Sequence, residues 1–282
     1  MEEPTLTEGE VWARDELACL RRRRFTPPAI GGFLIASGRR SAAVRSARPG
    51  LARQSQGWMA AGAGAWAVLA LAGVQPFRRR LWGGLGWWAA TSAMLDWHLG
   101  MMETEDGHPR SLGPADALTL TRAWLVPVAA DLPSPLVCAA AAATDVFDGR
   151  LARGSAPTRA GRDLEGLVDA CFAVAALRGA RRREWIGRVV VGAELTRLAA
   201  GFGYTLYVYF GQADSPDPAV TRAARVTTPV RAAGLIAAGA RHRRLADLLV
   251  AGGAAWSVFA VVRALHDRGL SPGAAASTLS GR

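Results

Sequence analysis

Apolar residues along the chain gather into windows of about twenty that carry few charged side chains. A helix of about twenty residues is long enough to cross the hydrocarbon core of a bilayer, and charged side chains are costly there. The predicted helices cover 57–76, 82–102, 114–130, 136–149, 161–178, 185–210, 228–240 and 245–265. The pattern therefore predicts an all-α, polytopic membrane protein.

Polar stretches with proline and glycine separate these windows and indicate boundaries. The predicted division is a polar, Arg-rich N-terminal segment, a two-helix membrane hairpin with its linker, a transmembrane domain, and a C-terminal tail. These parts cover 1–56, 57–113, 114–265 and 266–282, respectively. A second polar linker is expected at 211–227, inside the transmembrane domain.

The N-terminal segment leaves two alternatives open. Its apolar patch, 29–36, is too short to span a bilayer. Arginines punctuate the small residues that follow, a pattern that suits an interfacial helix on an anionic membrane. A solvated and partly disordered tail fits the composition equally well. Residues 1–24 lack the apolar core of a cleavable signal peptide.

The chain is strongly basic, with a net charge of +11, which raises nucleic acid as a partner. However, all 34 basic residues are arginines, and they cluster at the ends of the apolar windows, where anionic lipid head groups would meet them. We therefore expect membrane lipids, and no nucleic acid, as partners. The three cysteines lack the paired spacing of a metal site or a disulfide framework.

Several polar and aromatic residues inside the windows have expected structural roles. Asp96 and His98 are expected to cap a helix or reach the interface rather than bind a metal. Glu194 and Arg197, three apart, are expected to pair on one helix face, although an arginine facing a cavity could hold a phosphate. Arg122 can reach the interface or an anionic ligand. Interfacial positions are expected for Trp58, Trp82, Trp87, Trp88 and Trp97.

One stretch, 145–169, carries four acidic side chains at helical spacings. Asp145 and Asp148 are three residues apart, and Glu165 and Asp169 are four apart, so each pair shares one face of a helix. Two helices joined by the polar connector between them can point four carboxylates into one cavity. Clustered carboxylates in apolar surroundings are costly unless cations neutralise them, and hard divalent ions are their natural partners.

These residue types favour phosphoryl transfer. Two divalent ions about 3.5–4 Å apart can clamp a phosphoryl centre, while a carboxylate removes the proton of an incoming hydroxyl. Arg153 can contact a phosphate, and Gly149 and Gly154 allow the backbone to approach a ligand closely. The sequence therefore predicts phosphoryl transfer to an alcohol at a membrane.

The acidic stretch resembles the signature of the CDP-alcohol phosphatidyltransferase family. Its two halves read Asp145-x-x-Asp148-Gly149-x-x-Ala152-Arg153 and Gly161-x-x-x-Glu165-x-x-x-Asp169. The chain departs from the family pattern in two places, because the gap between the halves is one residue shorter and Glu165 stands where the third Asp is usual. Glutamate keeps the charge and the oxygen ligands, but sets its carboxylate about one methylene further out.

A second stretch supports the resemblance. The segment from Pro114 to Pro127 is similar to the P-N-A-L-T-L-x-R…P opening of the family's first core helix, with Asp116 where Asn is usual. The resemblance covers 114–265 and implies a core of six transmembrane helices. The apolar windows at 57–76 and 82–102 predict two further transmembrane helices N-terminal to that core.

The resemblance also implies roles for individual residues. The four acids Asp145, Asp148, Glu165 and Asp169 would hold two Mg²⁺ or Mn²⁺ ions, with Asp169 also the general base. Substrate contacts are implied for Gly149, Ala152, Arg153, Arg122, Arg225 and Arg231, of which the first three would line the cytidine diphosphate site. Arg225 and Arg231 would face a phosphorylated acceptor.

The enzyme implied by the resemblance transfers a phosphatidyl group from CDP-diacylglycerol to an alcohol and releases CMP, as a homodimer in the plasma membrane. Glycerol 3-phosphate is the favoured acceptor, because 114–127 looks most like the corresponding segment of phosphatidylglycerophosphate synthases; inositol phosphate and phosphatidylglycerol stay open. Loop arginines do not settle the orientation, so the active site is placed on the cytoplasmic face from the nucleotide-linked donor. The alternative is a catalytically silent scaffold or lipid-binding relative, motivated by Glu165 and the long N-terminal part.

Overall fold

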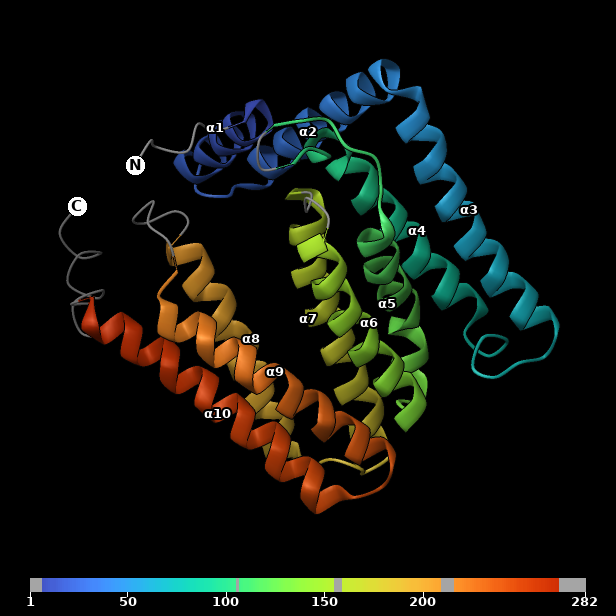
Figure 1. Cartoon of the computed structure of the whole chain (residues 1–282), viewed down its shortest axis with the longest axis vertical. Coiled ribbons are helices and arrows are strands. Elements are labelled where there is room, and N and C mark those ends of the chain that lie inside the picture. Colours follow the sequence, from blue (N-terminus) through green and yellow to red (C-terminus); the bar gives the residue numbers. More distant parts are fainter. Residues whose placement is uncertain (1–6, 105–106, 155–158, 209–215, 269–282) are drawn as a thin grey trace. The chain divides into compact units, whose positions relative to one another are not determined.

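The fold is all-α, as predicted. A computed structural model describes residues 7–104, 107–154, 159–208 and 216–268, without the side chains of Glu10, 148–154 and 159–163. The described helices are α1 (Glu8–Arg22), α2 (Pro27–Ala47), α3 (Pro49–Leu71), α4 (Leu81–His98), the 3-10 turn η1 (Leu99–Met101), α5 (Pro114–Asp131), α6 (Pro135–Gly154), α7 (Arg159–Arg182), α8 (Arg188–Tyr207), α9 (Pro218–Gly239) and α10 (Arg243–Asp267) (Figure 1).

Proline begins five of these helices, α2, α3, α5, α6 and α9. Proline suits the first helical position because its fixed φ is helical and its missing N–H would have no partner there. Two expected boundaries are wrong for this reason. Helix α3 begins at Pro49 rather than at 57, and α9 begins at Pro218, inside the expected linker 211–227. A hydropathy window marks the apolar part of a helix and misses its polar first turns.

The chain divides into two compact units. Unit 1 consists of Met1–Asp131 and Ala143–Ala175, and unit 2 consists of Leu132–Ala142 and Ala176–Arg282. Helices α6 and α7 therefore each contribute residues to both units.

The N-terminal segment is helical over 8–22 and 27–47 and packs within unit 1, so the alternative of a disordered tail does not hold for these residues. Ser41 of α2 donates its hydroxyl to the backbone oxygen of Asp96 on α4 at 2.6 Å, and Arg45 forms an ion pair with the Asp96 carboxylate. Asp96 is thus a packing contact between α2 and α4 rather than a partner of His98.

Helices α3 and α4 pack through a reciprocal arrangement of glycine and tryptophan. A Cβ at Gly62 of α3 would lie 2.3 Å from the Trp88 ring, and one at Gly84 of α4 would lie 2.1 Å from the Trp66 ring. Each glycine therefore makes room for an indole of the other helix, as small residues do where helices approach closely. Trp88 is buried and donates its N–H to the backbone oxygen of Met59 at 2.7 Å, so its expected interfacial position is wrong.

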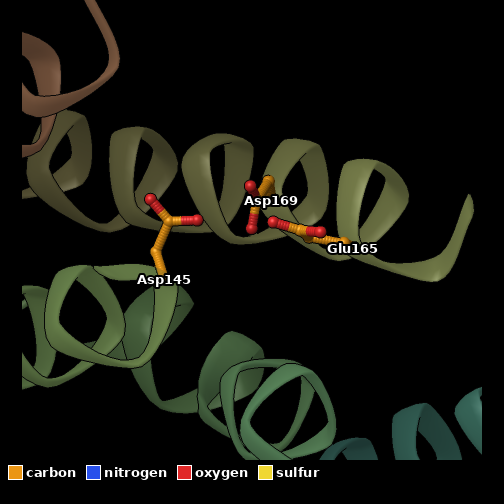
Figure 2. A group of neighbouring side chains, drawn as sticks. All are labelled: Asp145, Glu165 and Asp169. Atoms are coloured by element: carbon orange, nitrogen blue, oxygen red, sulfur yellow. The ribbon is translucent and has the colours of Figure 1, made fainter. Parts of the chain in front are cut away.

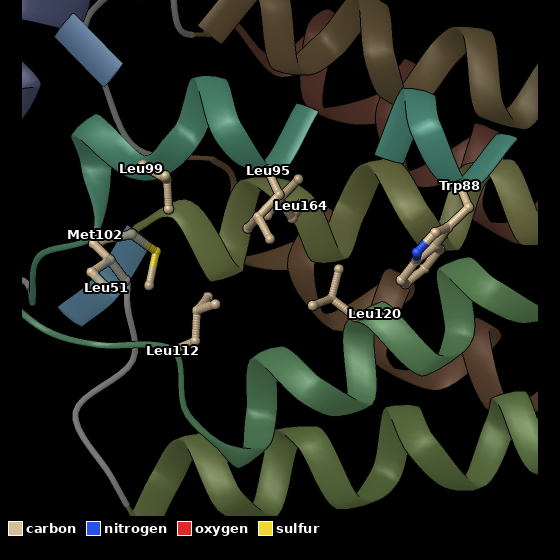
Figure 3. Packing of buried hydrophobic residues seen from close by; sticks show 8 residues of the cluster. All are labelled: Leu51, Trp88, Leu95, Leu99, Met102, Leu112, Leu120 and Leu164. Atoms are coloured by element: carbon tan, nitrogen blue, oxygen red, sulfur yellow. The ribbon is translucent and has the colours of Figure 1, made fainter. Parts of the chain in front are cut away.

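A buried apolar cluster joins α3 and α4 to α5 and to the part of α7 that lies in unit 1 (Figure 3). Its members are Leu51, Trp88, Leu95, Leu99, Met102, Leu112, Leu120 and Leu164. Gln54 holds the segment before α5 in place, because its side chain both donates to the Leu112 oxygen at 2.9 Å and accepts from the Leu112 N–H at 3.0 Å. The start of α5 is thereby tied to this cluster.

In unit 2, α10 packs along α8 and α9 (Figure 1). The buried positions of α10 are mostly small, whereas several of its large apolar residues are exposed. Small buried residues include Ala246, Gly253, Ala254 and Ala264, and large exposed residues include Leu248, Trp256, Phe259 and Val262. Helices of soluble proteins have the reverse arrangement. By length and composition, α10 is the one described helix that could cross a membrane, and the polytopic arrangement stays a prediction.

Candidate functional site

Three of the four predicted acids meet in unit 1. Asp145 lies on α6, while Glu165 and Asp169 lie four residues apart on α7 (Figure 2). One carboxylate oxygen from each of the three lies within 4.8 Å of those of the other two. All three side chains are partly buried. The sequence spacing thus correctly placed Glu165 and Asp169 beside each other and Asp145 opposite them.

The buried stripe of α7 fixes the direction of its two acids. Leu164, Val168 and Phe172 are buried at intervals of four residues, and Leu164 belongs to the apolar cluster of unit 1. Glu165 and Asp169 each follow one of these residues directly, so they lie at the edge of the buried face. Because the face of α7 with Leu164, Val168 and Phe172 packs in the core, both carboxylates lie beside that of Asp145 on α6.

Helix α5 brings a cation to the same place. The middle of α5 is fastened to its neighbours by two indole N–H groups. Trp87 of α4 donates to the Ala123 oxygen at 2.8 Å, and Trp124 donates to a backbone oxygen of α3 at 3.0 Å. Residue 127 is proline, which has no N–H for the Ala123 oxygen, so the Trp87 indole replaces the missing helical hydrogen bond. Arg122 lies on the turn that these bonds hold.

The Arg122 side chain is only 3% exposed and reaches the acidic cluster. Its Nη1 forms an ion pair with Asp169 and lies 3.6 Å from Oδ1 of Asp145. Its Nε donates to the hydroxyl of Thr144 at 3.3 Å. The sequence predicted an interface or an anionic ligand for Arg122, and it did not predict these acids as partners. The available signal was the cost of a buried arginine without a carboxylate nearby.

The donor set fits a hard divalent cation. All three ligand atoms are carboxylate oxygens, which Mg²⁺, Mn²⁺ and Ca²⁺ prefer, and they lie close enough together to share an ion. The predicted site residues Asp148, Gly149, Ala152 and Arg153 also lie on α6, but their side chains are outside the described part of the chain. Their roles stay predictions.

A second cluster of charges lies in unit 2. The predicted pair of Glu194 and Arg197 is confirmed, with 2.8 Å between Oε1 and Nη2. Arg231 of α9 joins the pair through Nη1, 2.7 Å from the same Oε1, and also donates to the Thr228 hydroxyl at 3.1 Å. Arg225 is exposed on α9. Contact of Arg225 and Arg231 with a phosphorylated acceptor stays a prediction.

Glycine makes this charge cluster possible. A Cβ at Gly253 of α10 would lie 2.6 Å from Cγ of Arg231, so the glycine leaves room for the arginine stem.

Scans against family models, curated proteins and solved structures found no match to this chain.

Proposed function

We propose that this chain is a CDP-alcohol phosphatidyltransferase of the membrane, which transfers a phosphatidyl group from CDP-diacylglycerol to an alcohol and releases CMP. One observation carries the proposal: the carboxylates of Asp145, Glu165 and Asp169 converge within 4.8 Å, from the two helices whose sequence resembles that family's motif. Glycerol 3-phosphate is the favoured acceptor, and a homodimer with its active site on the cytoplasmic face is the expected arrangement.

The acids of the motif would hold two Mg²⁺ or Mn²⁺ ions. Asp145, Glu165 and Asp169 supply oxygens at suitable separations, and Asp148 would complete the set. When bound, such ions neutralise the charge of the phosphoryl oxygens and orient the diphosphate. Glu165 offers the same oxygen ligands as the family's aspartate on a side chain that is longer by one methylene.

The remaining chemistry belongs to the chain itself. Asp169 would take the proton of the acceptor hydroxyl as the hydroxyl oxygen forms its bond to the phosphorus of the phosphatidyl group. The bond from that phosphorus to the CMP oxygen breaks, and CMP leaves with the electron pair. Gly149, Ala152 and Arg153 would line the cytidine diphosphate, where a guanidinium can contact phosphate oxygens in bidentate fashion.

The pattern of α10 supports a membrane location. Its large apolar residues face outward while its small residues pack inward, an arrangement that is favourable when the surroundings are lipid. A membrane location also accounts for the arginines at the ends of the apolar windows, which would meet anionic head groups.

The activity can be tested with purified full-length protein, labelled CDP-diacylglycerol, Mn²⁺ and a panel of alcohol acceptors, with CMP release as the measurement. Asp169→Asn should lower the turnover number by at least about 100-fold, because it removes a positioned base. Asp267→Asn is the matched control, since this carboxylate is exposed at the end of α10. If wild-type protein released no CMP with any acceptor, the proposal would be wrong.

A second candidate is a catalytically silent relative that binds lipid without turnover. Two observations favour it: Glu165 at the third acidic position, and the Arg122 guanidinium, whose single positive charge already contacts both Asp145 and Asp169. A silent relative should show no Mn²⁺-dependent rise in its unfolding temperature. The enzyme should be stabilised, because a ligand that binds only the folded state favours that state.

A further inference from the structure

Arg122 occupies the acidic cluster as a cation belonging to the chain itself. Its guanidinium contacts Asp145 and Asp169, which are two of the three described carboxylates. The Arg122 side chain is only 3% exposed, whereas the side chains of Asp145 and Asp169 are 34% and 39% exposed, so water reaches these contacts only from the carboxylate side. The cluster therefore has a built-in counter-charge.

A divalent cation needs the same carboxylates. Metal–oxygen bonds of about 2.0–2.6 Å would bring the ion within a few ångströms of any guanidinium nitrogen that stays bonded to those oxygens. Two like charges at that separation repel each other, and because the guanidinium is buried, water screens this repulsion only in part. Asp145 and Asp169 therefore cannot serve Arg122 and a divalent ion equally well at the same time.

The structure also gives Arg122 a second anchor. Its Nε donates to Thr144 at 3.3 Å, on the residue directly before Asp145. The Nη1 contacts with the two acids can therefore break while the Nε end of the guanidinium stays close to α6. The backbone of α5 is held independently by the indoles of Trp87 and Trp124.

We propose that Arg122 is a resident counter-ion that divalent cations must displace from Asp145 and Asp169 in order to bind. The inference rests on the proposed function, because it takes the cluster to be a cation site. It predicts that Arg122 weakens cation binding, although arginine is not a metal ligand.

The test measures Mn²⁺ affinity of the full-length protein in detergent, from the electron paramagnetic resonance signal of free Mn²⁺. Arg122→Gln should bind Mn²⁺ about tenfold more tightly or better, because no charge-assisted contact has to break first. Arg222→Gln is the matched control, since it removes the same charge from an exposed position on α9 and should leave the affinity unchanged. Folding of each variant is checked by circular dichroism.

Arg122→Lys keeps the buried charge and decides the question if the glutamine variant does not fold. Lysine cannot reproduce the fork of guanidinium contacts, so its Mn²⁺ affinity should lie between those of wild type and Arg122→Gln. Equal or weaker affinity of the folded variants would overturn the inference while the wild-type binding still supports the proposed function. Failure of wild type and variants alike to bind Mn²⁺ would overturn both.

Discussion

Glu194 is a carboxylate that unit 2 buries almost completely, with its side chain 3% exposed. One oxygen accepts from Arg197 and Arg231, while Oε2 has no hydrogen-bond partner among the described residues. The two arginines outnumber the single carboxylate, so Glu194 is what permits two guanidinium groups to lie side by side in this bundle. The pair Glu194–Arg197 followed from its spacing of three residues. Arg231 did not, because no local pattern relates α8 to α9.

Glu194→Gln should therefore lower the free energy of unfolding by about 3–5 kcal/mol, because it leaves buried arginines without an anion. The exposed pair of Asp267 and Arg263 provides the control, and Asp267→Asn should change stability by less than about 1 kcal/mol. Denaturant titration in detergent, followed by circular dichroism, measures both. Equal effects of the two substitutions would contradict a structural role for the buried cluster.

At the candidate site, too, the sequence predicted some contacts between residues and not others. The spacings of Asp145, Glu165 and Asp169 predicted that they would meet, because helical periodicity fixes which residues share a face. Their contact with Arg122 depends on how α5 packs against α6 and α7, which periodicity does not encode. In the structure, Leu120 of α5 and Leu164 of α7 belong to one buried cluster, which holds these two helices together.

At the scale of elements, hydropathy located the helices but not their ends. Helices α3 and α9 extend into stretches that the windows marked as polar, because proline and arginine are compatible with a helical first turn. No helix was predicted where α1 lies, whereas α2 covers part of the stretch for which an interfacial helix was one of two alternatives. Helix α2 contacts α4 through polar groups such as Ser41 and Asp96, which a search for apolar faces does not find.

The α3–α4 contact depends on two glycines. Gly84→Ala should lower the free energy of unfolding by about 1–3 kcal/mol, because the new methyl group would collide with the Trp66 ring. Gly83→Ala is the matched control, since a Cβ there meets nothing within 4 Å. It should stabilise the helix slightly, by roughly 0.5–1 kcal/mol. Unfolding midpoints compare the two variants, and a neutral Gly84→Ala would show that the helices are further apart than described.

At the scale of the whole molecule, the all-α class predicted from the sequence is confirmed, and the number of membrane spans stays a prediction. The windows at 161–178, 185–210 and 228–240 belong to helices that are long enough to cross a membrane but are less apolar or more charged than α10. A buried ion pair removes such charges from the helix surface, as Glu194 and its arginines illustrate. Hydropathy cannot detect this neutralisation, because partners on separate helices are far apart in sequence.

The outward face of α10 provides the test of membrane insertion. A spin label at Trp256→Cys, in a background without native cysteines and in lipid vesicles, should collide with oxygen more often than with a water-soluble nickel reagent. A label at Arg222→Cys, on the exposed start of α9, should show the reverse preference. If the nickel reagent reached both labels equally, the outward apolar face of α10 would lie in water.

The indole of Trp87 on α4 helps to hold the helix that carries Arg122, although α4 precedes the motif in the sequence. It supplies the hydrogen bond that Pro127 cannot make, on the turn that carries Arg122. A shortened chain starting at Pro114 would contain every residue of the motif and would still leave the Ala123 oxygen without that donor. The residues of the motif alone are therefore not sufficient to reproduce the geometry of the site. That geometry also depends on Trp87 of α4, which lies outside the motif. Transferring the motif to another scaffold therefore requires the tryptophan as well.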